Sequence, residues 1–248
     1  MIVGRQIIHL AQTTSTMDEI ERLARSCEME GIVVVADFQS LGRGRSGREW
    51  VARPGLALLC SILLRPEVPA NMVAALPLHL GVAVAQAIEE ASGTSCKLKW
   101  PNDLLVRGKK VAGILTTSRL KGNAIDHVTV GIGINLGPSL EDLPSSATSV
   151  SIEAGEQVAR QTMLDALLPR LDRRYRAFIA ASGQLDLSDW SDRAAFLGER
   201  VVVEDADRKV QGRYVGIDQQ GGLKLEMDDL STRVFVVGEL TRGPRLPE

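Results

Sequence analysis

Hydrophobic residues follow two kinds of spacing in the first part of the chain. Between Met17 and Cys27 they recur every three or four residues, which predicts an amphipathic helix, and Thr16 with Glu19 is typical of a capping box at its start. Continuous runs of aliphatic and β-branched residues instead predict buried strands. Those runs are residues 7–10, 31–36, 55–64, 109–115 and 128–134, with a basic strand and turn at 97–106.

Two longer apolar patterns predict core helices at residues 72–91 and 158–179, and Pro169 is expected to kink the second. Residues 138–155 are predicted to form a loop. The strands come in adjacent pairs rather than in regular alternation with helices. This order predicts an α+β fold with a mixed sheet, and not a doubly wound parallel sheet.

The pattern changes after Gly198, where short β-rich runs separated by turn residues predict a small all-β barrel. A length of 248 residues agrees with one main core and a small appendage. We therefore expect two domains, at residues 1–195 and 196–248. The predicted strands of the second domain are residues 200–204, 209–217, 222–227 and 232–237.

The composition excludes a disordered chain, because 44% of the residues are hydrophobic and only 24% are charged. The longest apolar stretch, residues 72–88, contains His79 and Gln86 and is followed by two glutamates, so it does not predict a membrane span. The N-terminus lacks the basic and hydrophobic regions of a signal peptide. We therefore expect a cytoplasmic protein with no membrane partner.

Three cysteines, Cys27, Cys60 and Cys96, lie far apart in apolar surroundings and are expected to be buried reduced thiols, with no metal site. The net charge of −2 hides two basic segments. Residues 42–53 carry a net charge of +3 and residues 97–110 carry +4, which leaves −9 for the rest. This distribution indicates a local site for a small anion rather than a nucleic-acid-binding face.

Residues 42–47, Gly-Arg-Gly-Arg-Ser-Gly, match the glycine pattern of a dinucleotide-binding loop, but Pro54 and an apolar strand follow where that motif needs a helix. A kinase glycine-rich loop is excluded because the chain contains no His-Arg-Asp or Asp-Phe-Gly triplet. What remains is a flexible loop in which Arg43, Arg45 and Arg48 alternate with glycines, suited to binding carboxylate or phosphate. The alternative is a solvated surface turn.

A second unusual string is Lys99-Trp100-Pro101-Asn102-Asp103. The proline is expected to hold Trp100 extended, so that its ring and the Asn102 amide lie against a flat ligand while Lys99 supplies charge. A tryptophan packed beneath a proline turn is the alternative.

Two glycine-containing strands complete the candidate chemistry. Lys110 opens a predicted strand and Gly113 allows a close approach behind its ammonium group, although a solvated lysine is the alternative. Residues 131–137 form a glycine-spaced strand that contains Asn135, suited to close contact with a ligand or a neighbouring strand. A plain edge strand or a bulge is equally compatible with that pattern.

Together these strings resemble the biotin protein ligases, also called biotin–acetyl-CoA-carboxylase ligases. The resemblance rests chiefly on Gly-Arg-Gly-Arg-x-Gly-Arg-x-Trp at 42–50 and on Lys-Trp-Pro-Asn-Asp at 99–103. It extends over nearly the whole chain, from about Thr13 to Thr241.

Three further motifs of that family can be compared with this chain. The family's Lys-x-Ala-Gly-Ile-Leu is intact at 110–115, and its Gly-x-Gly-x-Asn is intact at 131–135. Its Ser-Thr-Asn motif appears here as Ser15-Thr16-Met17. The third side chain therefore cannot donate an amide hydrogen bond, and only its backbone can serve.

The resemblance implies a mixed-sheet catalytic domain of the biotin/lipoate ligase type, followed by a small SH3-like β-barrel. It also implies a two-step reaction: biotin and ATP give biotinyl-5′-adenylate and pyrophosphate, and a lysine of a biotin carboxyl carrier domain then takes the biotin. Mg²⁺ is expected to arrive with the nucleotide phosphates. Because negative charge gathers in the first step, positive groups are required, and Arg43, Arg45, Arg48 and Lys110 are the candidates.

Within that set, Lys110, Arg48 and Arg45 are the expected catalytic residues. Hydrogen bonds to the ureido ring of biotin are expected from Ser15, Thr16 and Gln39, and Trp50, Asn102 and Asn135 are expected near the adenylate. The other residues expected to contact ligand are Met17, Gly42, Gly44, Lys99, Gly113 and Gly131.

Some members of the family carry an N-terminal DNA-binding domain, but the ligase motifs here begin by Thr13. We therefore expect the enzyme-only type, without DNA as a partner, as a monomer or homodimer. A lipoate ligase, which also forms an acyl-adenylate, is the alternative within the same chemistry. A non-catalytic nucleic-acid-binding module is the alternative of another class, and nine aromatic residues are few for base stacking.

Overall fold

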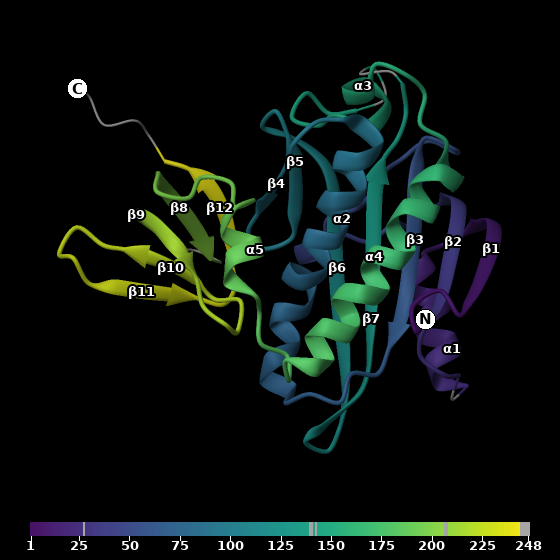
Figure 1. The fold of residues 1–248 in the computed structure, drawn as a ribbon, viewed down its shortest axis with the longest axis horizontal. Helices are drawn as coiled ribbons and strands as arrows, with labels where there is room; N and C mark the ends of the chain where they lie inside the picture. Colours follow the sequence, from purple (N-terminus) through teal and green to yellow (C-terminus); the bar gives the residue numbers. More distant parts are fainter. Residues whose placement is uncertain (27, 139–140, 142, 206–207, 244–248) are drawn as a thin grey trace.

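The computed structural model describes residues 1–26, 28–138, 141, 143–205 and 208–243. A seven-stranded sheet forms the larger part and a five-stranded sheet forms the C-terminal part (Figure 1). The first half of the larger part contains β1 (Gln6–Thr13), α1 (Thr16–Arg25), β2 (Ile32–Gln39), β3 (Ala57–Leu64), a 3₁₀ segment (Ala70–Ala75) and α2 (Leu76–Ser92). Its second half contains β4 (Cys96–Lys99), β5 (Asp103–Val106), β6 (Lys109–Lys121), β7 (Ala124–Asn135), α3 (Val150–Ala154), α4 (Arg160–Ala180) and α5 (Leu187–Ser191).

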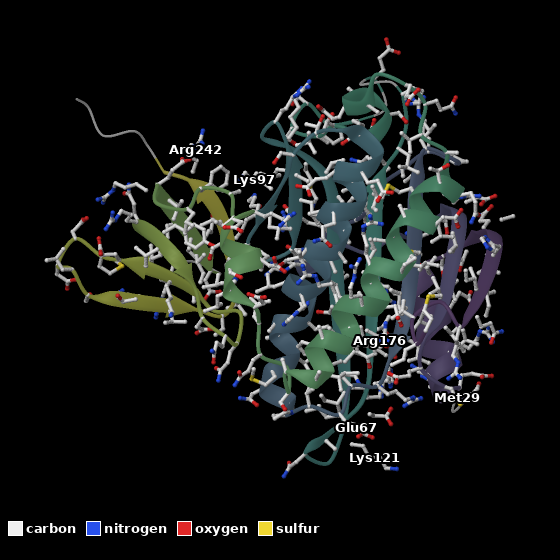
Figure 2. All side chains as sticks on the ribbon, in the orientation of Figure 1. Met29, Glu67, Lys97, Lys121, Arg176 and Arg242 are labelled. Atoms are coloured by element: carbon white, nitrogen blue, oxygen red, sulfur yellow. The ribbon has the colours of Figure 1, made fainter. Side chains whose placement is uncertain are left out.

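The larger sheet has the strand order β1-β2-β3-β7-β6-β5-β4. β1 and β2 are parallel and the other neighbours are antiparallel, so the sheet is mixed. β6 and β7 are the longest strands, and their hairpin projects beyond the others to Lys121 at its tip (Figure 2). The prediction of an α+β fold with a mixed sheet is confirmed.

Alternate residues of the central strands face two different cores. Val33 and Val35 of β2 face the main core beneath α2 and α4, whereas Val34 faces a smaller core that contains Ile20 and Ala24 of α1. This is the two-residue periodicity of a strand covered on both faces. α1 therefore lies on the opposite face of the sheet from α2 and α4, and its N-terminus opens toward β3 and β7.

The segment Ala70–Ser92 is long and apolar enough to cross a membrane by length and composition alone. Most of it is buried inside the protein, where α2 lies beside α4 on one face of the larger sheet (Figure 1). It is therefore a core helix, as the interruptions by His79 and Gln86 suggest.

The C-terminal part is an antiparallel sheet in the order β11-β10-β9-β8-β12. Its strands are β8 (Arg200–Asp205), β9 (Arg208–Ile217), β10 (Leu223–Glu226), β11 (Thr232–Phe235) and β12 (Glu239–Arg242). The predicted second, all-β unit is confirmed. The exact boundary between residues 195 and 196 stays a prediction, because Tyr214 and Leu223 of this sheet belong to the same continuous core as the larger part.

The two parts are joined by specific contacts. The Trp100 indole donates to the Gly221 carbonyl at 2.9 Å, and the Trp190 indole donates to the Tyr214 hydroxyl at 3.2 Å. Within the larger part, Lys97, on the side that faces the C-terminal part in Figure 2, donates to the Asp192 carbonyl at 3.1 Å and so holds the end of α5.

Three local predictions are corrected by the structure. Ser15, and not Thr16, caps α1, because its hydroxyl accepts from the Met17 N–H, while Glu19 accepts from Thr13 Oγ1 at 3.0 Å instead of closing a capping box. The predicted loop at 138–155 contains the helix α3, and the predicted strands of the second domain omitted β12. Short elements of four or five residues carry too little periodicity to be recognised from sequence.

Two of the three cysteines fit the expected reduced, buried thiols. Cys60 and Cys96 are both free and buried, and burial raises the pKa of each thiol to about 12. Cys27 lies outside the described residues.

Candidate active site

A cavity of about 140 Å³ lies at the N-terminus of α1, on the face of the sheet that α1 covers. Residues from α1, β2, β3, β6, β7 and the glycine–arginine loop line it. Segments far apart in the sequence thus meet at one place. They include the four motifs of the sequence analysis at 42–50, 99–103, 110–115 and 131–137. Most of the predicted site residues line this cavity.

One end of the cavity is a neutral hydrogen-bond cluster. The hydroxyl and the backbone N–H of Thr16 donate to Gln39 Oε1 at 2.8 and 2.7 Å, and the Thr16 hydroxyl lies 2.7 Å from the Ser61 hydroxyl. Ser15 is buried beside them as the cap of α1. Ser61 was missed by the sequence analysis, although a lone serine in the otherwise apolar strand β3 is a usable signal.

Met17 completes this end with an apolar wall. Its thioether packs on Gly131, where a Cβ atom would lie only 2.8 Å from the Met17 sulfur. Its backbone N–H is already directed to the Ser15 hydroxyl at 3.3 Å. Neither the side chain nor the free backbone of Met17 therefore supplies the polar contact that an asparagine offers at this position of the family motif.

Glycines on β6 and β7 let the Trp50 ring lie directly on the sheet. A Cβ at Gly133 would be 2.5 Å from the ring, and one at Gly113 would be 3.2 Å from it. The sequence predicted that a ligand or a neighbouring strand comes close to the glycine-spaced strand. In the structure, the side chains of Met17 and Trp50 take that place. The Trp50 Nε1 atom is buried without a hydrogen-bond partner among the described residues.

The other end of the cavity is rich in positive charge. Lys110 Nζ lies 2.5 Å from Asp103 Oδ1 and 5.5 Å from the centre of the Trp50 ring. Arg45 donates to Asn102 Oδ1 at 3.3 Å. Asp103 is a second residue that the sequence analysis left without a role, although it lies inside the second string.

The C-terminal part reaches this end of the cavity through the turn before β12. Arg45 donates to the Gly238 carbonyl at 3.2 Å, and Arg48 forms an ion pair with Glu239 at 3.0 Å. Burial, together with the neighbouring charge of Arg48, lowers the pKa of Arg45. Arg45 and Arg48 of the loop therefore contact residues that lie almost two hundred positions later in the chain.

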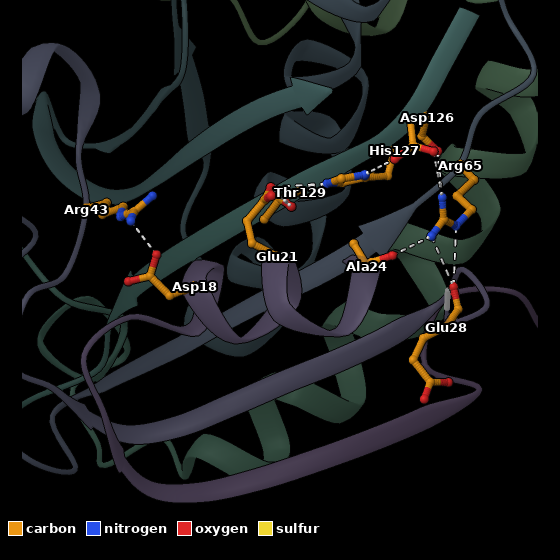
Figure 3. Close-up of polar contacts among 9 residues, drawn as sticks. All are labelled: Asp18, Glu21, Ala24, Glu28, Arg43, Arg65, Asp126, His127 and Thr129. Carbon is orange, nitrogen blue, oxygen red and sulfur yellow. Dashed lines mark hydrogen bonds and ion pairs between the residues drawn. The ribbon is translucent and has the colours of Figure 1, made fainter. Parts of the chain in front are cut away.

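The loop itself closes as a narrow hairpin. The Trp50 N–H donates to the Gly42 carbonyl at 2.9 Å, and the Gly44 N–H donates to the Arg48 carbonyl at 2.7 Å. A Cβ at Gly42 would lie 2.3 Å from the Trp50 carbonyl oxygen, so this glycine is needed for the closure. Arg43, at the edge of the cavity, pairs with Asp18 of α1 (Figure 3).

Three predicted site residues do not line the cavity. Gly42 acts within the loop hairpin, Asn135 donates to the Thr148 carbonyl at 3.0 Å, and Lys99 lies behind Asp103 with its Nζ 3.9 Å from that carboxylate. The prediction that the Trp100 ring lies against a flat ligand is wrong. Trp100 is 1% exposed and packs in the core beneath the C-terminal sheet, so the packing alternative holds.

Residues 9–135 match the Biotin/lipoate A/B protein ligase family, and residues 196–240 match the Biotin protein ligase C terminal domain. The biotin–acetyl-CoA-carboxylase ligase of Paracoccus denitrificans is 37% identical over 224 residues, which are 87% of this chain and 92% of that protein. The chain belongs to the biotin protein ligase family.

Two further relatives of this ligase family show how far the likeness extends. The bifunctional ligase/repressor BirA of Bacillus subtilis is 34% identical over 94% of this chain and 73% of that protein. The biotin protein ligase of Aquifex aeolicus, solved in complex with biotin and ATP, superposes with a TM-score of 0.81 at 31% identity over 96% of this chain and 100% of that chain. The predicted family, fold and ligase class are confirmed.

Proposed function

We propose that this chain activates biotin with ATP to biotinyl-5′-adenylate and transfers the biotin to a lysine of a carrier domain. One observation carries the proposal: a single cavity has a neutral hydrogen-bonding end at Thr16, Gln39 and Ser61 and a cationic end at Arg45 and Lys110. Biotin has the same polarity, with a neutral ureido ring at one end and a carboxylate at the other.

The neutral end is suited to the ureido ring. Hydroxyl and amide groups can donate and accept, so they match a neutral cyclic urea without the cost of burying a charge. Met17 and the carbon face of Leu59 line the walls between the two ends. These walls are suited to the thiophane ring and the acyl chain.

The cationic end is where the carboxylate of biotin meets the α-phosphate of ATP. A carboxylate oxygen forms a bond to phosphorus, and pyrophosphate leaves with the electron pair. Negative charge rises on the phosphoryl oxygens during this step, and preorganised cations stabilise it. Lys110 is the proposed principal group, while Arg45 and Arg48 neutralise the polyphosphate.

The Trp50 ring, held flat on the sheet, is the proposed support for the adenine, and Asn102 lies beside it at the adenylate. The unpartnered Trp50 N–H is available to a ligand acceptor. Asn135 and Lys99 contribute indirectly. Asn135 holds the backbone at Thr148, and Lys99 holds the Asp103 carboxylate.

Mg²⁺ is proposed to enter with the nucleotide. The described residues contain no group of three or more histidine, cysteine, aspartate or glutamate side chains placed to hold a metal. Asp103 is a carboxylate at the cationic end, and it is already paired with Lys110. The phosphate oxygens are therefore the main ligands that this site offers the ion.

In the second step, a lysine amine of the carrier domain attacks the acyl carbon, AMP leaves, and the amine loses a proton. We propose that the acceptor is a biotin carboxyl carrier domain, as the name of the Paracoccus relative implies for that protein. The cytoplasm, where ATP and such carriers occur, is the proposed location. Monomer and homodimer are both compatible with the cavity, which one chain completes.

Pyrophosphate release tests the first step. Purified protein is mixed with ATP and Mg²⁺, and biotin, lipoate or octanoate is added in separate reactions, with a reaction lacking any acid as the control. Turnover with biotin alone is expected. Turnover with lipoate or octanoate but not with biotin would replace the proposal by the lipoate-ligase alternative. Mass spectrometry of a carrier domain then checks for the added biotinyl group.

A further inference from the structure

A second polar cluster lies along α1, away from the cavity (Figure 3). His127 of β7 is 1% exposed, with Nδ1 2.7 Å from Asp126 Oδ2 and Nε2 3.3 Å from both carboxylate oxygens of Glu21. Thr129 Oγ1 donates to Glu21 Oε1 at 2.8 Å. These residues belong to no part of the mechanism described above.

This cluster and the cavity share one face of β7. Residues 127, 129 and 131 point to the same side of a strand, because side chains alternate. On α1, Met17 and Glu21 are four residues apart and therefore lie on one helix face. Met17 meets β7 at Gly131, and Glu21 meets it at Thr129 and His127, so the helix is attached to the strand at two consecutive points.

Arg65, just after β3, secures the far end of the same helix (Figure 3). It donates to the Ala24 carbonyl at 3.2 Å, in the last turn of α1, where the regular helical donors end. It also donates to the Asp126 carbonyl at 2.8 Å. The polar contacts thus run from Arg65 through Asp126 and His127 to Glu21.

The charge states agree with these contacts. Burial tends to raise the pKa of Glu21, but the hydrogen bonds from Thr129 and His127 outweigh it and lower that pKa. The hydrogen bond from His127 lowers the pKa of Asp126. Ionised carboxylates can only accept, so the donors in these contacts come from the groups that face them.

Overall stability does not by itself require such a cluster. A buried set of charges is often no more stabilising than apolar residues of similar volume, and α1 already has an apolar contact through Ile20 and Ala24. Apolar packing, however, tolerates a helix sliding or turning by a fraction of an ångström. Directional bonds at Glu21 do not, and one turn earlier the same helix carries Thr16 and Met17 into the cavity.

We propose that His127 is a positioning residue of the biotin-activating site, which acts through Glu21 to hold Thr16 and Met17 of α1 at the neutral end of the cavity. The inference rests on the proposed function, because it assigns that end to the biotin head group. It predicts that loss of the cluster weakens capture of biotin and leaves the handling of ATP unchanged.

The test compares steady-state kinetics of His127→Ala, His127→Gln and Thr129→Val with the wild type. Loss of a charge-assisted hydrogen bond at His127 is expected to raise KM for biotin roughly tenfold. The kcat and the KM for ATP should stay within about twofold of wild type, because the cationic end is untouched. His127→Gln keeps a donor toward Glu21 and should recover most of the affinity, with Thr129→Val in between.

His9→Ala is the matched control, since His9 is exposed on the edge strand β1. It should leave every constant unchanged. A merely structural role for His127 would lower the active fraction, and thereby kcat, without moving KM for biotin. An unchanged KM for biotin in folded His127→Ala, or equal losses in the use of biotin and ATP, would overturn the proposal.

Hydrogen exchange of the amides in residues 16–25 separates this proposal from the proposed function. Faster exchange there in His127→Ala, with other helices unchanged, supports the cluster as the anchor of α1. Unchanged exchange contradicts it. Absence of any biotin-dependent turnover in the wild type would instead contradict the proposed function. Hydrogen exchange alone would then test whether the His127 cluster anchors α1.

Discussion

The two strings that most clearly identify this chain, residues 42–50 and 99–103, behave differently in the fold. In the first, the arginines and Trp50 reach the cavity. In the second, only Asn102 and Asp103 reach it, while Trp100 turns into the core. A characteristic motif therefore marks the neighbourhood of a site without giving each of its side chains a role in binding.

The difference follows from what surrounds each string. The loop at 42–50 lies at the edge of the cavity, and its hydrogen-bonded hairpin presents side chains to it. The string at 99–103 connects β4 to β5 beneath the C-terminal sheet. Trp100 there contributes to the core, while Asn102 and Asp103 face the cavity.

The largest expected effect comes from Trp100→Ala. Removing this buried ring and its bond to Gly221 should lower the free energy of unfolding by about 3–5 kcal/mol. Chemical denaturation monitored by circular dichroism measures it. Trp50→Ala is the matched control, and it should lose less stability while raising KM for ATP. If Trp50→Ala proved the more destabilising, the contrast between the two strings would be reversed.

Lys110→Ala should abolish most adenylate formation while the fold stays intact. Losing one preorganised cation at a developing charge costs about 3–4 kcal/mol, or roughly 10²- to 10³-fold in rate. Single-turnover formation of biotinyl-adenylate measures the step. Wild-type rates in this variant would show that Asp103 does not hold Lys110 for chemistry.

Arg45→Gly should still make biotinyl-adenylate but release it early. This side chain bonds both Asn102 of the second string and Gly238 of the C-terminal part. Losing a charged hydrogen bond to the intermediate should weaken retention by about 1.5–3 kcal/mol, roughly 10- to 100-fold in dissociation. Blotting for biotin on serum albumin, added with ATP and biotin, detects the escape. Albumin labelled no more than by wild type, despite adenylate formation, would remove this role.

The smallest effect is expected for Lys99→Met. Its ammonium lies 3.9 Å from Asp103, outside the cavity, so the pair contributes about 0.2–1 kcal/mol. The change in kcat should therefore stay within about fivefold. A loss equal to that of Lys110→Ala would place Lys99 in direct contact with the substrate.

Long periodic patterns were sufficient to predict the larger elements. The apolar runs located β2, β3, β6 and β7, and the change of pattern after Gly198 located the second sheet. Patterns failed for α3, α5 and β12, which have only four or five residues. They also failed at the cap of α1, where Ser15 and Thr16 are both residue types that cap helices.

The candidate site was predictable where residue type alone restricts the chemistry. Arginines among glycines, and a lysine opening a strand, indicated an anion site, and Arg45, Arg48 and Lys110 do meet at one end of the cavity. Ser61 and Asp103 were not predicted. Their importance depends on which partners face them, Thr16 and Lys110 respectively, and those partners are at least seven residues away.

The sequence by itself determined the mixed α+β class, the second all-β unit and the residues that carry charge into the site. These depend on local spacing and residue chemistry, which are properties of short segments. Only the tertiary structure decided that Trp100 is a core residue, that Gly131 and Gly133 make room for Met17 and Trp50, and that Glu21 and His127 meet. Such contacts join residues up to 121 positions apart. No local pattern records which side chains the fold will bring face to face.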